Sequence, residues 1–394
     1  MSEPTPSVPP VSVVLAGGGS AGHTSPLIAT AEQLRVLAPG VRLTAVGTAR
    51  GLETHTVPAA GLPLELIPPV PMPRRPGPDL LAVPGRLRRA VADAAAVLRR
   101  VEADVVLGFG GYVSTPVYLA ARRLRVPIVI HEQNAVPGLA NRLAARFTEH
   151  VATSFPDTPL PHARHLGLPL RTAITALADP GLDRAALRRE TRTDWGFRDD
   201  QPLLLVTGGS QGARSINTAV LGAKEQLLAR GIQVLHVLGG KNVTAADVEV
   251  VDPGTGAAYR PVGYVDGMER AYAAADLVLC RSGASTVLET AVAGLPALFV
   301  PYPVGNGEQA KNAVAVVRVG GGRLLPDADC TAERLTDLVP GLITDREQLA
   351  AMATATRSVA VVDAAERLAR LTLEVAAGGT PGRRTTTGNT EGER

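Results

Sequence analysis

The sequence is poor in aromatic and sulfur-containing residues. Only 3 % of its 394 residues are aromatic, and it contains two cysteines, Cys280 and Cys330. Two widely separated cysteines form neither a disulfide framework nor a metal-ligand pattern, which favours a reducing, cytoplasmic compartment. The scarcity of aromatic side chains argues against binding of single-stranded nucleic acid by base stacking. We therefore expect no nucleic-acid partner.

Long apolar runs are missing as well. No stretch approaches the roughly 20 apolar residues that a membrane-spanning helix needs. The opening segment MSEPTPSVPP is acidic and proline-rich, and it lacks the positive charge that begins a secretory signal peptide. We expect a protein that can touch a membrane without crossing it.

Two motifs of metal-dependent phosphate chemistry are also absent. Neither glycine-rich loop of the chain ends in Gly-Lys-Ser/Thr, so the sequence does not indicate ATP hydrolysis with Mg²⁺ or a kinase. No Asp-x-Asp motif stands in a convincing position at the end of a strand. We expect that no cofactor is required and that a divalent cation is at most stimulatory.

Charge is distributed unevenly along the chain. The overall formal charge is +3, but basic residues are in excess only up to Arg171, and the remainder is net acidic. Such asymmetry indicates that the first half faces an anionic surface, either a membrane or a nucleic acid. A merely soluble basic face is the alternative.

Two parts of the chain share one plan. Residues 11–36 and 202–228 each read as a short buried strand, a glycine-rich loop and a helix. The apolar segments 103–107 and 275–279 extend the similarity, because each is followed by a Gly-containing turn and a Ser-Thr pair. Since the chain is longer than one core usually serves, we predict an α/β protein with two Rossmann-like domains. Each would be a doubly wound parallel sheet with helices on both faces.

We place the domain boundary after Arg171, where Pro and Gly punctuate the sequence. This gives an N-terminal domain at 11–171 and a C-terminal domain at 172–375, whose last helix is expected to pack back on the N-terminal domain. Residues 1–10 are predicted to be flexible and residues 376–394 a disordered tail. Because parallel sheets bind ligands beyond the carboxyl ends of their strands, we expect the site in a central cleft between the domains.

The first glycine-rich loop, Gly17–Gly22, matches G-x-G-x-x-G between a strand and a helix, which is typical of dinucleotide binding. An NAD site usually has an acidic residue at the end of the second strand, but this chain has Gly47 and Thr48 there and reaches Glu53 only later. A glycine turn needed only for backbone geometry also remains open. His23 follows at the helix N-terminus, which favours the neutral imidazole of a general base. Its alternative is a structural hydrogen bond.

Three further segments place polar groups at strand ends. The loop Gly208–Gly212 presents backbone N–H groups and a helix N-terminus to a diphosphate. In Arg281–Glu289, the last residue either holds a ribose diol or complements the helix dipole in the first turn. His131–Asn134 ends another buried strand, so its side chains either form a cleft floor or cap a helix at 138–146.

A basic and apolar segment lies in the first half of the chain. Cationic residues near an anionic leaflet contribute about 1 kcal/mol each, so this segment can dock reversibly on acidic lipid. A solvated helix is the alternative. The candidate membrane contacts are Arg74, Arg75, Leu80, Leu81, Arg86, Leu87, Arg88 and Arg89.

Taken together, six segments of the sequence resemble the family-28 glycosyltransferases over nearly the whole chain, from residue 11 to about 373. One departure from the family pattern is Ser20-Ala21, where the common sequence is Thr-Gly. The change keeps a hydroxyl and adds a methyl to the loop. The six segments are Gly18–His23, Gly110–Ser114, His131–Asn134, Gly208–Arg214, Arg281–Glu289, and Glu308-Gln309 with Asn312-Ala313.

The resemblance implies the GT-B architecture and a specific reaction. That reaction is inverting transfer of GlcNAc from UDP-GlcNAc to the C4 hydroxyl of MurNAc in lipid I, which is undecaprenyl-pyrophosphoryl-MurNAc-pentapeptide. The products are lipid II and UDP, in peptidoglycan synthesis. The implied location is the cytoplasmic face of the bacterial cell membrane, as a peripheral protein. Implied partners are UDP-GlcNAc, lipid I, anionic inner-leaflet lipid and other membrane-side peptidoglycan enzymes.

The resemblance also implies where the donor binds. The Ser210 loop would contact the diphosphate, the Val265 backbone the uracil, Glu289 the ribose, and Ala284 and Gln309 the GlcNAc. His23 is the candidate catalytic base. The implied substrate-binding residues are Ser20, Ala21, Gly22, Asn134, Arg171, Ser210, Val265, Ala284, Ser285, Thr286, Val287, Leu288, Glu289 and Gln309.

Three alternatives remain at this point. A UDP-GlcNAc 2-epimerase binds the same donor without an acceptor, and a non-catalytic sensor would bind it without turnover. Another GT-B glycolipid or antibiotic glycosyltransferase would differ in its acceptor, which depends on loops whose shape the sequence does not reveal.

Overall fold

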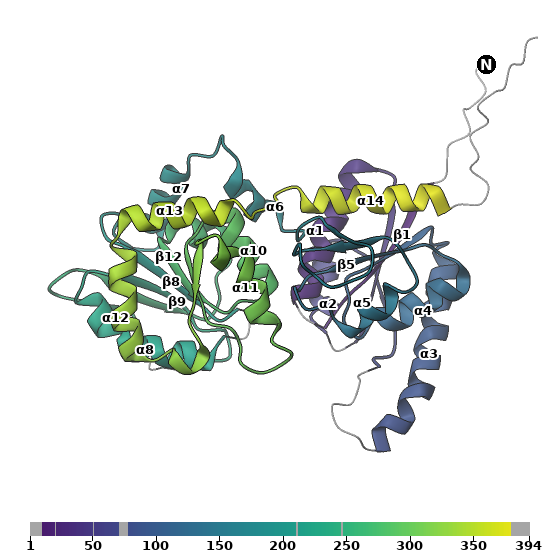
Figure 1. Ribbon diagram of the computed structural model, residues 1–394, viewed down its shortest axis with the longest axis horizontal. Helices are drawn as coiled ribbons and strands as arrows, with labels where there is room; N and C mark the ends of the chain where they lie inside the picture. Colours follow the sequence, from purple (N-terminus) through teal and green to yellow (C-terminus); the bar gives the residue numbers. More distant parts are fainter. Residues whose placement is uncertain are drawn as a thin grey trace, which may run out of the picture.

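The computed structural model describes residues 10–19, 21–49, 51–70, 78–209, 212–245 and 247–379. It shows two α/β units side by side along the long axis of the molecule (Figure 1). Nearly all of the predicted flexible N-terminus lies outside the described residues. So does the part of the predicted tail that follows residue 379.

The N-terminal unit is built on a sheet of seven parallel strands in the order β3-β2-β1-β4-β5-β6-β7, counted over the described residues. Its strands are β1 (Ser12–Ala16), β2 (Arg42–Gly47), β3 (Leu64–Leu66), β4 (Val105–Gly108), β5 (Ile128–Glu132), β6 (Val151–Thr153) and β7 (Ala163–His165). Its helices are α1 (Ala21–Leu37), α2 (Glu53–Ala59), α3 (Pro78–Arg100), α4 (Ser114–Leu124) and α5 (Leu139–Ala144).

The C-terminal unit repeats this plan with the order β10-β11-β9-β8-β12-β13-β14, in which the β10–β11 pair is antiparallel. Its strands are β8 (Leu203–Thr207), β9 (Gln233–Val237), β10 (Val250–Val251), β11 (Ala258–Val262), β12 (Leu277–Cys280), β13 (Ala297–Phe299) and β14 (Gly322–Leu324). Its helices are α6 (Thr172–Thr175), η1 (Ala176–Ala178), α7 (Arg184–Asp194), α8 (Arg214–Leu228), α9 (Met268–Ala274), α10 (Ala284–Ala293), α11 (Glu308–Arg318), η2 (Asp327–Asp329), α12 (Ala332–Ile343), α13 (Arg346–Arg357) and α14 (Ala364–Gly379).

Strand β1 shows why these segments form doubly wound sheets. Val13 and Leu15 belong to the core on one face of the sheet, and Val14 and Ala16 to the core on the other. Each fully buried Val or Leu side chain contributes roughly 1.5–3 kcal/mol relative to exposure, so a strand that is apolar on both faces needs helices on both. The predicted pair of doubly wound domains is confirmed.

After α13 the chain crosses back to the N-terminal unit, where the last helix, α14, lies (Figure 1). Leu368, Leu371 and Val375 join the core that also contains α1 and strand β1. The prediction that the tail begins at residue 376 was wrong for its first residues, because α14 continues to Gly379 and Ala376 is buried. Apolar residues continue as far as Ala376 on the face of this helix that packs against α1.

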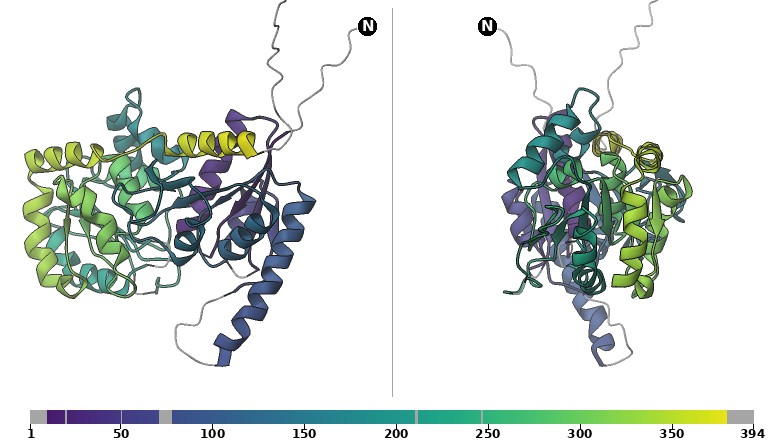
Figure 2. Two further views of the ribbon diagram at one scale, coloured as in Figure 1. Left: turned by 45° about the vertical axis from the view of Figure 1, so that its right-hand side comes forward. Right: turned by 90° about the vertical axis from the view of Figure 1, so that its left-hand side faces the viewer.

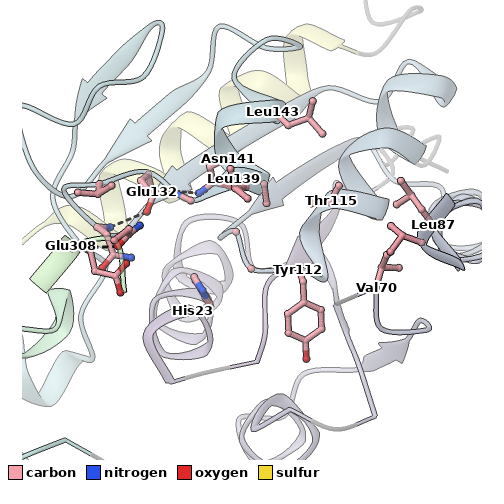
Figure 3. A pocket seen from close by; sticks show the side chains of 18 residues that line it. His23, Val70, Leu87, Tyr112, Thr115, Glu132, Leu139, Asn141, Leu143 and Glu308 are labelled. Atoms are coloured by element: carbon pink, nitrogen blue, oxygen red, sulfur yellow. Dashed lines mark hydrogen bonds between the residues drawn. The ribbon is translucent and has the colours of Figure 1, made fainter. Parts of the chain in front are cut away.

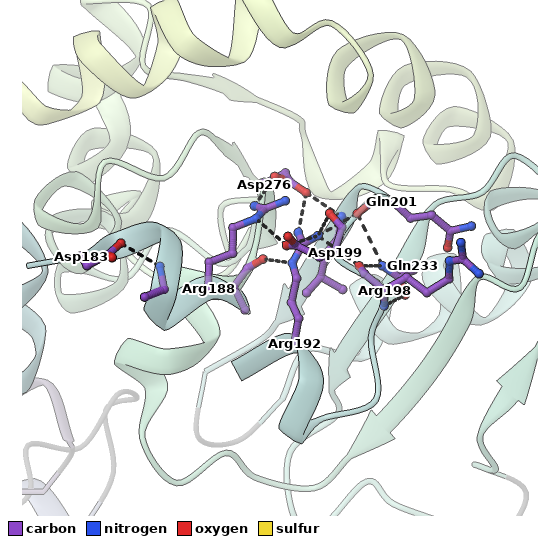
Figure 4. A network of polar contacts seen from close by, with 11 residues as sticks. Asp183, Arg188, Arg192, Arg198, Asp199, Gln201, Gln233 and Asp276 are labelled. Carbon is purple, nitrogen blue, oxygen red and sulfur yellow. Dashed lines mark hydrogen bonds and ion pairs between the residues drawn. The ribbon is translucent and has the colours of Figure 1, made fainter. Parts of the chain in front are cut away.

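A buried ion-pair network holds α7 against the start of β12 (Figure 4). The side chain of Arg192 is fully buried and donates to Asp276 Oδ2 at 2.8 Å and to the Ala274 carbonyl at 2.9 Å. A buried guanidinium is tolerated when its N–H groups are paired in this way. The network anchors the strand whose far end leads into the segment Arg281–Glu289.

Helix α3 projects from the body of the N-terminal unit (Figure 2). Its second half packs on the sheet through Ala94, Ala95 and Leu98, whereas its first turns extend beyond the sheet. Within the described residues, no helix combines the length and the apolar character needed to span a bilayer.

Candidate active site

A cavity of about 590 Å³ opens where the carboxyl ends of the N-terminal strands face α11 of the C-terminal unit. Glu132 and Glu308 lie at one end of it, and Val70 and Leu87 at the other (Figure 3). His23 stands in the wall between them. The cavity therefore has a polar end at the junction of the two units and an apolar end beside α3.

The first glycine-rich loop leads into α1, which begins at Ala21, three residues before the predicted start at Thr24. Gly22 and His23 therefore lie in the first helical turn, and His23 is half-buried. Ser20 lies outside the described residues, and nothing is described of the Ala21 side chain.

Glu53 lies directly beneath this loop, a role that the sequence did not reveal. Its carboxylate is fully buried and accepts hydrogen bonds from the backbone N–H of Gly19 at 2.8 Å and of Thr48 at 3.0 Å. Burial tends to raise the pKa of Glu53, but these hydrogen bonds outweigh it and hold the pKa below its usual value. Because the Gly19 amide is committed to Glu53, a bound phosphate would have to use other amides of the loop.

The room for this carboxylate comes from glycines. A Cβ at Gly18, Gly47 or Gly51 would lie within 2.6 Å of an atom of the Glu53 side chain. The sequence signal for this contact was that two of these glycines, Gly47 and Gly51, stand close to Glu53 in the chain.

Strand β5 places His131–Asn134 at the polar end of the cavity region. Glu132 accepts hydrogen bonds from the backbone N–H groups of Asn134 at 2.9 Å and Gly138 at 3.0 Å. The alternative that His131 and Asn134 cap the following helix was therefore wrong. Glu132 binds the Gly138 amide instead, because β5 continues to residue 132 and directs this carboxylate toward α5.

Asn312 of α11 joins the two units at this point. Its Oδ1 accepts from the backbone N–H of Ala135 at 2.8 Å, and its Nδ2 donates to Asn134 Oδ1 and to the Ser282 carbonyl, each at 3.2 Å. The side chain is fully buried. Asn312 therefore brings Asn134 next to the loop that precedes Ala284.

The second glycine-rich loop ends at the N-terminus of α8, and Ser210 within it lies outside the described residues. Gly212 has φ = +71°, and a Cβ there would stand 2.0 Å from the Leu238 carbonyl oxygen, so only glycine fits. Arg281 turns inward and donates to the Val300 carbonyl and to Asp327. These contacts join the end of β12 to the segment after β13 and to η2.

Glu289 lies in the second turn of α10, since that helix begins at Ala284. The alternative that it complements the helix dipole from the first turn was therefore wrong. Its Oε2 accepts from the Tyr272 hydroxyl at 2.9 Å. Burial raises the pKa of Glu289, and the hydrogen bond from Tyr272 and the positive charge of Arg171 partly offset this rise. Arg171 therefore lies close enough to Glu289 for its positive charge to act on the carboxylate.

The remaining predicted donor residues occupy neighbouring positions. Val265 is half-buried and lines a separate cavity of about 490 Å³. Gln309 accepts from the backbone N–H of Tyr302 at 2.9 Å. In the first turns of α10, the side chains at 285 and 286 are half-buried and those at Ala284, Val287 and Leu288 are buried.

The predicted membrane segment falls on α3 and the residues before it. Arg86, Arg88 and Arg89 are exposed, whereas Leu87 is half-buried and lines the cavity. Leu80 and Leu81 lie in α3 with side chains that are not described. Arg74 and Arg75 lie outside the described residues.

Comparison with known proteins decides the family. The N-terminal domain model of glycosyltransferase family 28 matches residues 13–153, and its C-terminal domain model matches residues 203–368. A protein of Nocardioides sp. is 57 % identical over 93 % of this chain and 98 % of its own length. A protein of Cutibacterium acnes is 55 % identical over 91 % of this chain and 96 % of its own length. The chain belongs to glycosyltransferase family 28.

Both relatives of this family-28 enzyme are named UDP-N-acetylglucosamine–N-acetylmuramyl-(pentapeptide) pyrophosphoryl-undecaprenol N-acetylglucosamine transferase. Among solved structures, MurG of Acinetobacter baumannii matches with a TM-score of 0.72 at 28 % identity, over 93 % of this chain and all of that one. The calicheamicin glycosyltransferase CalG4 shares the fold, with a TM-score of 0.67 at 17 % identity over 94 % of this chain and 99 % of that one. The predicted GT-B architecture is confirmed, and the chain is a glycosyltransferase rather than an epimerase or a sensor.

Proposed function

We propose that this family-28 glycosyltransferase transfers GlcNAc from UDP-GlcNAc to the C4 hydroxyl of MurNAc in lipid I, forming lipid II and UDP in peptidoglycan synthesis. The relatives that match over nearly the whole chain carry the name of this reaction. The observation that carries the proposal is the cavity at the junction of the units, which is polar at Glu132 and Glu308 and apolar at Val70 and Leu87. An acceptor with a polar sugar head and an apolar polyprenyl tail matches these two ends of the cavity.

The donor lies on the C-terminal unit in this proposal. Backbone N–H groups at the N-termini of α8 and α10 face the diphosphate, where helix ends favour negative charge. The ribose binds Glu289, the uracil binds the Val265 backbone, and the GlcNAc lies near Ala284 and Gln309. Asn134 and Arg171 complete the site from the neighbouring unit and the junction.

The chemistry is a single in-line displacement with inversion at the anomeric carbon. His23, which lies in the cavity wall, accepts the proton of the attacking hydroxyl. The helix N-termini stabilise the charge on the departing UDP. Because these dipoles already supply positive potential at the diphosphate, no resident metal is required, and a divalent cation is at most stimulatory.

The enzyme works at the cytoplasmic face of the cell membrane in this proposal. The exposed arginines of α3 lie next to the apolar end of the cavity, where the acceptor's lipid tail would leave the protein. Contact of α3 with anionic inner-leaflet lipid would hold this end of the cavity at the bilayer, close to other membrane-side peptidoglycan enzymes.

The test is release of UDP from UDP-GlcNAc with and without a lipid I analogue, in the presence and absence of a chelator. We expect acceptor-dependent release that persists without divalent cations. His23→Ala should lower kcat by about 10²- to 10⁴-fold. Glu289→Ala should act mainly by raising the KM for UDP-GlcNAc, because it removes a contact to the ribose.

His55→Ala is the matched control, because His55 is an exposed histidine of the same unit. Its activity should equal that of the native protein. Folded native enzyme that releases no UDP in response to the acceptor, or that converts UDP-GlcNAc alone into its 2-epimer, would overturn the proposal.

A further inference from the structure

A chain of hydrogen-bonded side chains runs from the cavity wall into the interior of the N-terminal unit. Nδ1 of His23 lies 3.0 Å from Oε1 of Gln133. Nε2 of Gln133 lies 3.1 Å from Nδ1 of His131 and donates to the His131 carbonyl at 2.9 Å. Nε2 of His131 lies 2.9 Å from the carbonyl oxygen of Gly167. Gln133 and His131 are buried, whereas His23 is half-buried and reaches the cavity.

The protons in this chain can be assigned from its buried end. A carbonyl oxygen only accepts hydrogen bonds, so Nε2 of His131 must carry the proton that it donates to Gly167. Burial lowers the pKa of His131 to about 4, so the ring is neutral at physiological pH and its Nδ1 is an acceptor. That acceptor fits the amide group of Gln133, which donates one proton to it and the other to the His131 carbonyl.

The orientation of Gln133 then fixes the state of His23. With both amide protons directed at His131, Oε1 faces His23 and can only accept. Nδ1 of His23 must therefore carry a proton, which leaves Nε2 of the neutral ring unprotonated. A Cβ added at Gly111, which lines the cavity, would lie 3.6 Å from this Nε2.

We propose that Gln133 and His131 are positioning residues that hold His23 in the Nδ1-protonated tautomer, so that Nε2 faces the cavity as the proton acceptor of the transfer reaction. The inference rests on the proposed role of His23 as the base. The same arrangement serves the ring after it has accepted a proton, because Nδ1–H continues to donate to Gln133. The ring thus changes charge without turning.

The far end of the chain lies at the junction of the two units. Gly167 has φ = +86°, and a Cβ there would stand 2.6 Å from the Cβ of Val361 in the segment that leads to α14. The carbonyl that sets the tautomer of His131 is therefore held by close packing where the chain crosses between units.

Gln133→Leu and Gln133→Glu test the proposal in the full-length enzyme. Leucine has a similar size but no acceptor, so the tautomer of His23 is no longer constrained. We expect kcat to fall about 10- to 100-fold, the size of effect known for residues that orient metal-ligating histidines. The KM for UDP-GlcNAc should stay within about twofold of native, because the Gln133 side chain is bonded to His23 and His131 and makes no donor contact in this scheme.

Gln133→Glu should shift the acidic limb of the kcat–pH profile to higher pH. A carboxylate next to Nδ1 favours the imidazolium, so His23 is lost as a base at a higher pH. The other titratable groups around His23 are Glu132 and Glu308 in the cavity wall, and Tyr112 and Glu53 beside the first glycine-rich loop. None of these side chains is altered in this variant, although His131 loses the hydrogen bonds that Gln133 donates to its ring and to its carbonyl.

Nitrogen NMR of the labelled histidine rings provides a readout that a merely structural role would not move. The native enzyme should show His23 protonated at Nδ1, and Gln133→Leu should show a mixture of tautomers. Two outcomes would contradict this inference and leave the proposed function standing. One is an inactive His23→Ala variant together with native kcat in Gln133→Leu, and the other is a native His23 ring protonated at Nε2. Full activity of His23→Ala would instead remove the proposed base, and absence of acceptor-dependent turnover would remove the proposed function.

Discussion

Three carboxylates around the cleft have different partners and therefore different roles. Glu53 and Glu132 accept hydrogen bonds from backbone N–H groups and so fix the loops beside them. Glu289 accepts from the hydroxyl of Tyr272, which leaves lone pairs for a ligand. Buried carboxylates bonded to backbone amides are committed to structure, whereas the arrangement at Glu289 suits a ribose diol.

Tyr272→Phe should shift the pH dependence of donor binding. Burial raises the pKa of Glu289 and the Tyr272 hydroxyl lowers it, so the variant loses the lowering contribution and its pKa rises further. As pH falls through that pKa, the carboxylate takes up a proton and binds the ribose less well. We therefore expect the KM for UDP-GlcNAc to begin rising at a higher pH than in native enzyme.

Tyr259→Phe is the matched control for this measurement. Tyr259 is buried in the same unit, but it pairs with His236 instead of a donor residue. Its KM profile should follow that of the native enzyme. Identical profiles for native enzyme and Tyr272→Phe would show that Tyr272 does not tune Glu289.

At the scale of single elements, α3 combines two functions along its length. Its second half packs on the sheet, while Arg86, Arg88 and Arg89 are exposed nearer its start, and Leu87 between them lines the cavity. Replacing the three arginines by glutamine should weaken binding to anionic vesicles at low salt. At about 1 kcal/mol for each cation, the partition coefficient should fall on the order of 100-fold, as measured by vesicle sedimentation.

Turnover of a water-soluble acceptor analogue should not change in this triple variant, since none of the three arginines lines the cavity. The matched control replaces Arg323, Arg334 and Arg346, which are exposed on the C-terminal unit. An equal loss of vesicle binding in both triple variants would show that only net charge matters and would remove the membrane role of α3.

At the scale of the whole molecule, the two units are joined by the crossing of α14 and by the buried side chain of Asn312. Asn312→Ala leaves the Ala135 N–H and the Ser282 carbonyl without this partner, at a cost of about 1–3 kcal/mol. We expect the units to separate more readily, so that the radius of gyration from X-ray scattering increases. The KM for UDP-GlcNAc should rise, because Asn134 loses the contact that holds it against the C-terminal unit.

Asn217→Ala provides the comparison for this variant. Asn217 makes side-chain hydrogen bonds of the same kind, but to Leu238 and His236 within the C-terminal unit. It should lower the melting temperature without changing the radius of gyration. If Asn312→Ala also leaves the radius of gyration and the KM unchanged, Asn312 does not act as a link between the units.

Much of the fold and part of the site follow from local sequence. The runs at 11–16 and 202–207 are apolar on both faces and are followed by glycines, which is enough to predict buried parallel strands and the loops after them. The positions of helix ends were predicted less well. Helix α1 begins earlier than Thr24, and Glu289 falls in a second turn rather than a first, because helix starts depend on which amides are bonded nearby.

The sequence by itself determined the doubly wound plan, the two glycine-rich loops and the family, because each depends on residues close together in the chain. The tertiary structure alone decided which distant side chains hold the site residues in place. The contacts of Glu53 with Gly19, of His23 with Gln133 and of Asn312 with Ala135 join residues 34, 110 and 177 positions apart. Such partners meet only after the order of the strands and the crossing between the units have been set. Hydrogen bonding then selects among polar residues that local sequence cannot distinguish.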